Sequence, residues 1–187
     1  METLRLVTML GSLRAGSLNG MLARALPGLA PAGVEVAPLP GLGTLPLYDA
    51  DVQARGFPPE VEALAEAIRA ADGVVIVSPE YNYSLPGVLK NALDWLSRLP
   101  QQPLAKKPVA IMSVSPGGVG GARMQHHLRQ VLVFLDAYVL PRPEIMVGGA
   151  AGKFDEAAGT LTDQSTRDHV AAHLQAFAGF ARLVGRR

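Results

Sequence analysis

The sequence predicts one α/β domain in which a doubly wound, five-stranded parallel sheet carries helices on both faces. Short apolar runs such as 73–77 (GVVIV) and 108–114 (PVAIMSV) contain no polar alternation, which is typical of parallel strands buried on both sides. Segments with the helical spacing of apolar residues separate these runs. The chain has 187 residues and is 49% hydrophobic, which is enough to bury a sizeable core, so we expect a single domain over 1–187.

The first third of the chain already shows strands alternating with helices. Residues 4–10 (LRLVTML) predict a first strand. A first helix should begin near Ser17, whose hydroxyl can cap it, and should stop at the Pro27–Gly28 pair. A short second strand covers 34–39. The segment 40–59 is rich in Pro and Gly, so we expect a loop, and a loop of this length is usually functional or interfacial.

The rest of the chain repeats the pattern. A helix that begins at Pro58 and Pro59 and ends near Asp72 precedes the strand at 73–77. The remaining elements follow in order: an amphipathic helix carrying residues 88–96, a strand at 108–114, a loop at 115–121, a helix at 123–136, a last strand region at 138–140 and 144–147 interrupted by Pro141 and Pro143, and a final helix at 165–184.

Composition excludes several classes of protein. The formal net charge is +1 and the basic residues are spread along the chain, so we expect no nucleic-acid binding. The absence of cysteine excludes disulfides and thiolate chemistry and fits a reducing compartment. The N-terminal apolar run is too short to span a membrane and lacks the pattern of a signal peptide, so we expect a cytoplasmic protein without membrane association.

The loop after the first strand, 11–19 (GSLRAGSLN), is rich in groups that bind phosphate. It matches neither a dinucleotide turn nor a P-loop, because the glycine spacing of both is missing. It instead offers hydroxyls, an amide and the guanidinium of Arg14 at the positive end of a helix. A terminal monophosphate needs many donors converging on one small group, and this loop supplies them.

A second loop follows the third strand and has the composition of a flat-ligand site. After Pro79 come Glu80, Tyr81, Asn82 and Tyr83, before the next helix begins. In a flavodoxin-like strand order of 2-1-3-4-5 the first and third strands are neighbours, and a mononucleotide such as FMN binds where the order reverses. The loops at 11–19 and 79–83 could then share one FMN molecule, with the glycine-rich loop 115–121 beside it.

Five segments together resemble the NADPH-dependent FMN reductase family, the flavodoxin-like group that includes bacterial quinone and chromate reductases. They cover nearly the whole chain, and their combination is specific where any one alone would be weak. The segments are GSLRAGSLN at 11–19, PLYDAD at 46–51, SPEYNYSLPGVLKNALDWLSR at 78–98, GGARMQHHLRQ at 120–130 and FDEAAGTLTD at 154–163.

The resemblance implies a set of cofactor-binding residues in three loops. The FMN phosphate would contact the first loop, the isoalloxazine would lie on the second largely through backbone groups, and the third would flank the ring. The residues so implied are Ser12, Arg14, Ser17, Leu18 (through its backbone) and Asn19; Pro79, Glu80, Tyr81, Asn82 and Tyr83; and Ser115, Gly117 and Gly118.

The resemblance also implies a homodimer or homotetramer. Tyr83, Arg123 and Glu144 match positions that contact a neighbouring subunit in the family. Many relatives have Tyr where this chain has His126, so a hydrogen-bonded contact there would be weaker or sensitive to pH.

The reaction implied is hydride transfer from NADPH or NADH to N5 of FMN, followed by ping-pong reduction of quinones, chromate, azo compounds or free flavin. No acid–base pair is needed, and we expect no catalytic side chain. The alternative is a non-enzymatic electron carrier of the flavodoxin type, but such carriers are usually acidic and this chain is not. A sensor domain is a third possibility, for which the sequence offers no partner surface.

Two features have a purely structural interpretation as well. Glu80 could form an ion pair with Arg123 in place of any role toward a ligand. His169 and His173 stand four residues apart on a helix and could chelate a metal, but no third ligand is evident. We therefore expect a solvated helix face there and no metal site.

Overall fold

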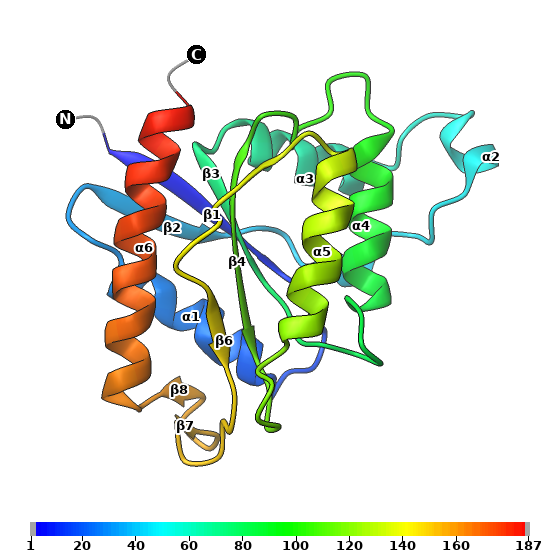
Figure 1. Ribbon diagram of the computed structural model, residues 1–187. Helices are drawn as coiled ribbons and strands as arrows, with labels where there is room; N and C mark the ends of the chain where they lie inside the picture. Colours follow the sequence, from blue (N-terminus) through cyan, green and yellow to red (C-terminus); the bar gives the residue numbers. More distant parts are fainter. Residues whose placement is uncertain (1–2, 186–187) are drawn as a thin grey trace.

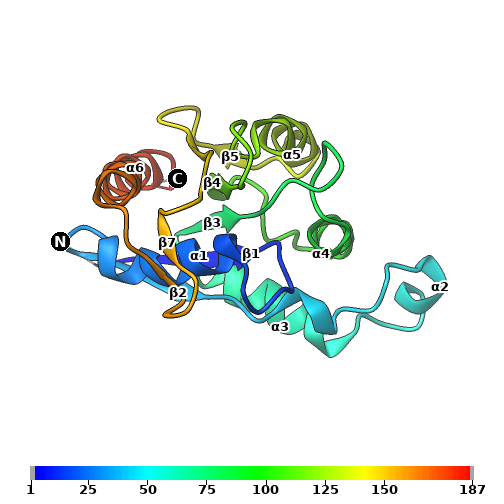
Figure 2. The same ribbon diagram turned by 90° about the horizontal axis from the view of Figure 1, so that it is seen from below.

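The computed structural model describes residues 3–185 as one parallel sheet between two layers of helices (Figures 1 and 2). The strand order is β2-β1-β3-β4-β5, which confirms the predicted 2-1-3-4-5 order. The first four strands are β1 (Leu4–Leu10), β2 (Val34–Pro38), β3 (Gly73–Val77) and β4 (Pro108–Val114). All pairings in this sheet are parallel, so the carboxyl ends of these strands meet at one edge.

The central strands β3 and β4 are buried over their whole length. Their register places Val74 beside Val109 and Val77 beside Met112. A strand covered on both faces can use apolar side chains at every position, which is why these two segments show no alternation in the sequence.

The fifth position of the sheet is filled by two short strands where the sequence predicted one interrupted region. Strand β5 (Tyr138–Val139) pairs with the beginning of β4, and β6 (Ile145–Val147) pairs with its end. The prolines between them, Pro141 and Pro143, have no N–H to donate, so pairing stops there and resumes beyond. Strand β6 thereby reaches the same edge as the carboxyl end of β4.

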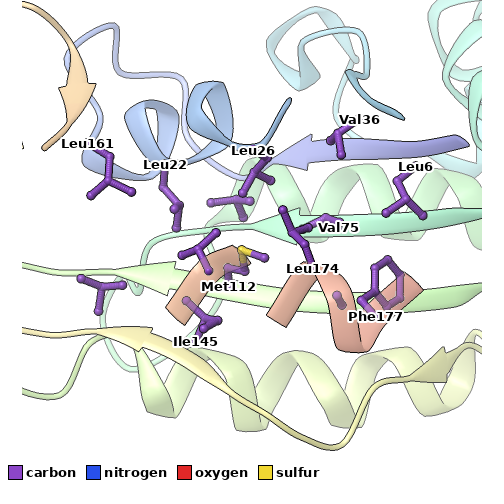
Figure 3. Packing of buried hydrophobic residues seen from close by; sticks show 14 of the residues in the cluster. Leu6, Leu22, Leu26, Val36, Val75, Met112, Ile145, Leu161, Leu174 and Phe177 are labelled. Carbon is purple, nitrogen blue, oxygen red and sulfur yellow. The ribbon is translucent and has the colours of Figure 1, made fainter. Parts of the chain in front are cut away.

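Helices cover the two faces unequally. On one face α1 (Leu18–Leu29) and α6 (Gln164–Val184) pack on the sheet, and on the other lie α3 (Pro59–Arg69), α4 (Gly87–Ser97) and α5 (Ala122–Phe134). Figure 3 shows part of the first core, where Leu22 and Leu26 of α1 and Leu174 and Phe177 of α6 point toward Val75 and Met112 of the sheet. Within residues 3–185, no helix has the length and apolar character that a bilayer crossing requires.

Helix α1 starts where the sequence predicts but ends later. Ser17 is its N-cap, and the Ser17 side chain accepts a hydrogen bond from the Gly20 N–H, as expected. The prediction that the helix stops at Pro27 was wrong, because Pro27 lies inside the last turn. There the ring removes only one hydrogen bond, its φ suits a helix, and the preceding Leu26 is fully buried. Packing therefore carries the helix past the proline to Leu29.

The Pro- and Gly-rich segment from 40 to 58 forms an arm that projects away from the sheet beside α4 (Figures 1 and 2). It contains the short helices η1 (Leu42–Thr44) and α2 (Ala50–Gln53), which the prediction of a plain loop missed. The arm is fastened through Pro46, whose carbonyl oxygen accepts hydrogen bonds from Trp95 Nε1 and Asn91 Nδ2, each at 2.8 Å.

A small antiparallel hairpin of β7 (Phe154–Asp155) and β8 (Thr160–Leu161) was also not predicted. It packs against α1, where Arg24 Nη2 donates to the Gly159 oxygen at 3.3 Å. Strands of two residues leave too little periodicity in the sequence to be recognised.

Candidate flavin site at the carboxyl edge of the sheet

Three loops that follow β1, β3 and β4 meet at the carboxyl edge of the sheet, which Figure 2 shows from below. The Gly11 N–H donates to the Val77 oxygen at 2.9 Å, and the Ser78 N–H donates to the Met112 oxygen at 3.1 Å. A Cβ atom on Gly11 would lie only 2.4 Å from Ser78 Oγ. The first two loops therefore touch through a glycine, and any side chain at position 11 would push them apart.

The first loop presents unpaired donors at the start of α1. The Arg14 side chain is exposed and donates to the Gly16 oxygen at 2.8 Å, and the buried Ser12 hydroxyl accepts a long bond of 3.4 Å from the Arg14 N–H. The Gly20 N–H is capped by Ser17, but the N–H groups of Leu18 and Asn19 have no acceptor within the helix. With no acidic residue in the first turn of α1, this end of the helix suits an anion.

The side chain of Asn19 has a role that the sequence did not reveal. Its Nδ2 donates to the Val114 oxygen and its Oδ1 accepts from the Val114 N–H, each at 2.9 Å, and the residue is 3% exposed. Strand β3 ends beside Met112, so Val114 has no strand partner on that side. The amide of Asn19 takes the place of that partner, so of the polar groups of Asn19 it is the backbone N–H at the start of α1 that could still meet an anion.

The second loop is a tight hairpin. Tyr81 and Ser84 exchange two backbone hydrogen bonds of 3.0 Å, and the two residues between them, Asn82 and Tyr83, adopt left-handed conformations with φ of 48° and 69°. Asn tolerates this region, whereas an aromatic residue adopts it only when its surroundings hold it there. Both tyrosines are largely exposed, Tyr81 at 50% and Tyr83 at 70%.

The hairpin is held by the first turns of α5. Glu80 Oε1 accepts from Arg123 Nε at 2.5 Å, and Glu80 Oε2 accepts from the Met124 N–H at 3.2 Å. The Arg123 guanidinium also lies 3.8 Å from the centre of the Tyr83 ring. The interpretation of Glu80 as an ion-pair partner of Arg123 is thus confirmed, and its carboxylate also meets the positive end of α5.

A further contact in the hairpin was missed. Ser84 Oγ and His127 Nδ1 lie 2.8 Å apart, which joins the end of the hairpin to the second turn of α5. Residues 43 positions apart in sequence give no local signal of such a contact.

The third loop packs closely against the segment after β6 and is hydrogen-bonded to it. The Gly149 N–H donates to the Gly117 oxygen at 3.0 Å, and a Cβ on Gly148 would lie 2.3 Å from the Gly118 oxygen. Ser115 Oγ donates to the same Gly117 oxygen at 3.0 Å. The predicted residues Ser115, Gly117 and Gly118 therefore lie in a loop whose backbone path is already set.

The residues predicted at subunit contacts have partners within the chain. Arg123 binds Glu80, and Glu144 Oε1 lies 3.7 Å from Arg129 Nη2. His126 is exposed on α5. These contacts leave the assignment of the residues to an interface as a prediction.

The two histidines on α6, His169 and His173, differ in their exposure to solvent. His169 is exposed, as expected of a solvated face, but His173 is 1% exposed and its Nδ1 lies 2.8 Å from the Pro143 oxygen, so that expectation was wrong for His173. The signal that could have found this is helical spacing, since His173 shares the buried stripe of Val170 and Phe177. Over the described range 3–185, no group of three or more His, Asp or Glu residues is placed to hold a metal ion.

The buried state of His173 predicts a pH dependence of stability. Burial lowers the pKa of His173 from 6.5 to about 4, with the hydrogen bond to Pro143 acting in the opposite direction. Because the folded pKa is depressed, neutral His173 contributes stability above pH ~6.5 that is lost as pH falls toward ~4, by about 3 kcal/mol in all. We would measure the free energy of unfolding in urea for wild type and His173→Leu across this pH range. As the pH falls, the free energy of the wild type should decrease by about 3 kcal/mol more than that of the variant. The exposed His126→Leu is the control, because His169 contributes to the lowered pKa of His173. Parallel curves for wild type and His173→Leu would contradict the assignment.

The two hydrogen bonds between the Asn19 amide and the Val114 backbone predict that removing this side chain lowers stability. Asn19→Ala leaves both backbone groups of Val114 without their partner, so we expect the free energy of unfolding of the apoprotein to fall by about 2–4 kcal/mol in urea titrations. Ser12→Ala, which removes only the long bond from Arg14, should change it by less than about 1 kcal/mol. An apoprotein as stable as wild type after Asn19→Ala would mean that the amide serves a ligand and not β4.

Comparison with known proteins agrees with this geometry. Residues 4–152 match the model of the family described as NADPH-dependent FMN reductase. The chain is 61% identical over 184 residues to a quinone reductase of Escherichia coli K12, with 98% of both chains covered. It is 46% identical over 183 residues to an NAD(P)H-dependent FMN reductase of Pseudomonas aeruginosa, again with 98% of both covered.

Comparison with solved structures also finds flavoenzymes and flavodoxins with this fold. The structure of FerB, a flavoenzyme NAD(P)H:(acceptor) oxidoreductase from Paracoccus denitrificans, superposes with a TM-score of 0.86 and 34% identity, covering 96% of this chain and 98% of that one. A flavodoxin mutant from Pseudomonas aeruginosa, at 17% identity and a TM-score of 0.58 with 94% and 100% covered, shares the fold. The chain therefore belongs to the NADPH-dependent FMN reductase family, which confirms the predictions of an oxidoreductase, of FMN as its cofactor and of NAD(P)H as its co-substrate.

Proposed function

We propose that this enzyme reduces quinones with electrons from NAD(P)H, with FMN held by the three loops at the carboxyl edge of the sheet. The observation that carries the proposal is the contact of the donor-rich first loop with the second loop at Gly11 and Ser78. Because the two loops touch, one mononucleotide can reach both. The donor set fits a phosphate at one end, and the glycine-lined third loop fits a flat ring at the other.

The phosphate would be held by residues of the first loop. Arg14 and the hydroxyls of Ser12 and Ser17 supply charged and neutral donors, and Leu18 and Asn19 supply backbone N–H groups at the start of α1. Hydrogen bonds to a dianion from such donors are among the strongest in proteins, and the helix dipole adds to them. The exposed guanidinium of Arg14 would turn from the Gly16 oxygen toward the phosphate.

The ring would lie between the second and third loops. Residues 79–83 would contact it mainly through backbone groups, because the Glu80 carboxylate already binds Arg123 and Met124. Gly117 and Gly118 let the backbone of the third loop approach from the other side. The exposed rings of Tyr81 and Tyr83 would form the rim that an arriving substrate meets.

Bound FMN supplies a hydride acceptor at N5 and a two-electron donor in its reduced form. The chain's own contribution is to bind the phosphate, orient the ring and leave one face open to two substrates in turn. The open rim therefore suits ping-pong kinetics, with NAD(P)+ leaving before the acceptor enters. A broad choice of acceptors would follow, and azo compounds, chromate and free flavin would join quinones at lower specificity.

The proposal extends to the oligomeric state of the enzyme and its location in the cell. We propose a homodimer or homotetramer with Tyr83, Arg123, His126 and Glu144 near its interfaces, located in the cytoplasm, on the strength of the sequence resemblance alone. Arg123 would then serve both its own hairpin and the neighbour. A flavodoxin-type electron carrier is less well supported, since the reductase relatives match the chain over almost its full length.

The activity has a direct test. Anaerobic mixing of the FMN-loaded protein with NADPH or NADH should bleach the flavin absorbance in a single rapid phase, and added quinone should restore it. Comparing the two nucleotides also measures the preference between them. A flavin that only an external reductase can bleach would support the carrier in place of the enzyme.

The phosphate site has its own test. Arg14→Ala removes a charge-assisted hydrogen bond and should weaken FMN binding by about 1.5–3 kcal/mol, measured by quenching of flavin fluorescence. Arg24→Ala on the same helix removes an exposed arginine whose side-chain hydrogen bond goes to the Gly159 oxygen of the β7–β8 hairpin, and should leave FMN affinity unchanged. Equal affinities in wild type and Arg14→Ala would place the phosphate elsewhere.

A further inference from the structure

A fully buried amide lies in the first turn of α5. Gln125 is 0% exposed, and its neighbours on the buried side of the helix, Met124 and Leu128, are apolar. Placing an amide in an apolar core costs free energy for every polar atom that stays unbonded, and Gln125 Oε1 has no hydrogen-bond partner among the described residues. A Leu or Met would fill the same space without that cost. The bonds that Gln125 makes therefore indicate its purpose.

These bonds form a directed chain that ends on the third loop. Gln125 Nε2 donates to Ser113 Oγ at 2.8 Å and to the Ile145 oxygen at 2.7 Å. Ser113 Oγ in turn donates to the Gly120 oxygen at 2.6 Å. Because the hydroxyl proton goes to Gly120, the hydroxyl can only accept from Gln125, and both amide hydrogens are used. The orientation of all three groups is fixed by this pattern.

The end of the third loop that this chain of hydrogen bonds reaches is closely packed against β4 and β6. Gly120 and Gly121 have φ of 64° and 88°, and a Cβ on either would meet Met146 backbone or the Ser113 side chain at 2.7 Å. The backbone of this part of the loop thus lies directly on the Met146 backbone at Gly120 and on Ser113 at Gly121. The other end of the loop, at Gly117 and Gly118, lies against Gly148 and Gly149.

We infer that Gln125 and Ser113 are positioning residues that hold loop 115–121 in the path that receives the flavin ring. The inference rests on the proposed function for the location of the ring. Neither side chain would touch the cofactor: Gln125 acts through Ser113, and Ser113 acts through the Gly120 carbonyl. A role confined to core packing would not need a chain of donors that terminates on the flavin-side loop.

The test separates the ring end of the site from the phosphate end. Binding of FMN and of riboflavin, which lacks the phosphate, is measured by fluorescence quenching for wild type, Gln125→Met and Ser113→Ala. Both variants should bind both flavins about tenfold more weakly, since the ring contacts are affected, whereas Arg14→Ala should weaken FMN far more than riboflavin. The exposed Gln130→Met on the same helix is the matched control and should bind both like wild type.

Hydrogen exchange in the apoprotein gives a second readout that needs no flavin. Amides of 115–121 should exchange at least tenfold faster in Ser113→Ala and Gln125→Met than in Gln130→Met. If Gln125→Met does not fold, Ser113→Ala alone decides the matter. Flavin affinities within twofold of wild type together with unchanged exchange of the loop would overturn the inference. Failure of the wild type itself to bind FMN would instead contradict the proposed function, and the exchange result would still stand.

Discussion

The parallel pairing of β1, β3 and β4 is the constraint on which the rest of the structure depends. Because the three strands run side by side in one direction, the segments after Leu10, Val77 and Val114 all emerge at one edge. Helices on both faces bury β3 and β4 over their whole length, so the side chains of these two strands are almost all apolar and the polar groups at this edge lie mainly in the loops. The candidate flavin site is a direct result of that topology.

Each of the three loops is held in place by a polar side chain that joins two different elements. Asn19 of α1 completes the edge of β4 at Val114, Glu80 joins the hairpin to α5, and Gln125 acts through Ser113 on the third loop. Two of these contacts, those of Asn19 and Gln125, join a helix to β4, and both are buried. The loops therefore have defined paths before any ligand arrives, which lowers the ordering cost of binding.

The sequence predicts the strand order and the three loops well, because long apolar runs and glycine-rich turns leave strong local signals. Prediction from the sequence is wrong where tertiary contacts determine where a helix ends or which side chain is buried. Burial of Leu26 extends α1 past Pro27, and the apolar stripe of α6 draws His173 into the core. The left-handed turn at Tyr83 is likewise held by distant partners, here Arg123. The amide of Asn19 looks like a ligand-binding group in sequence, and only the end of β3 beside Met112 explains why β4 needs it.

A crystal structure of the protein with bound FMN would show which residues hold the cofactor. We expect the phosphate at the start of α1, with its oxygens about 3 Å from the N–H groups of Leu18 and Asn19, and the ring between residues 79–83 and the Gly117–Gly118 backbone. The loop backbones should differ from those described here by less than about 1 Å, as in other preorganised sites. A phosphate bound away from residues 11–19, or a third loop whose backbone changes path around the ring, would show that these loops are not a preformed flavin site.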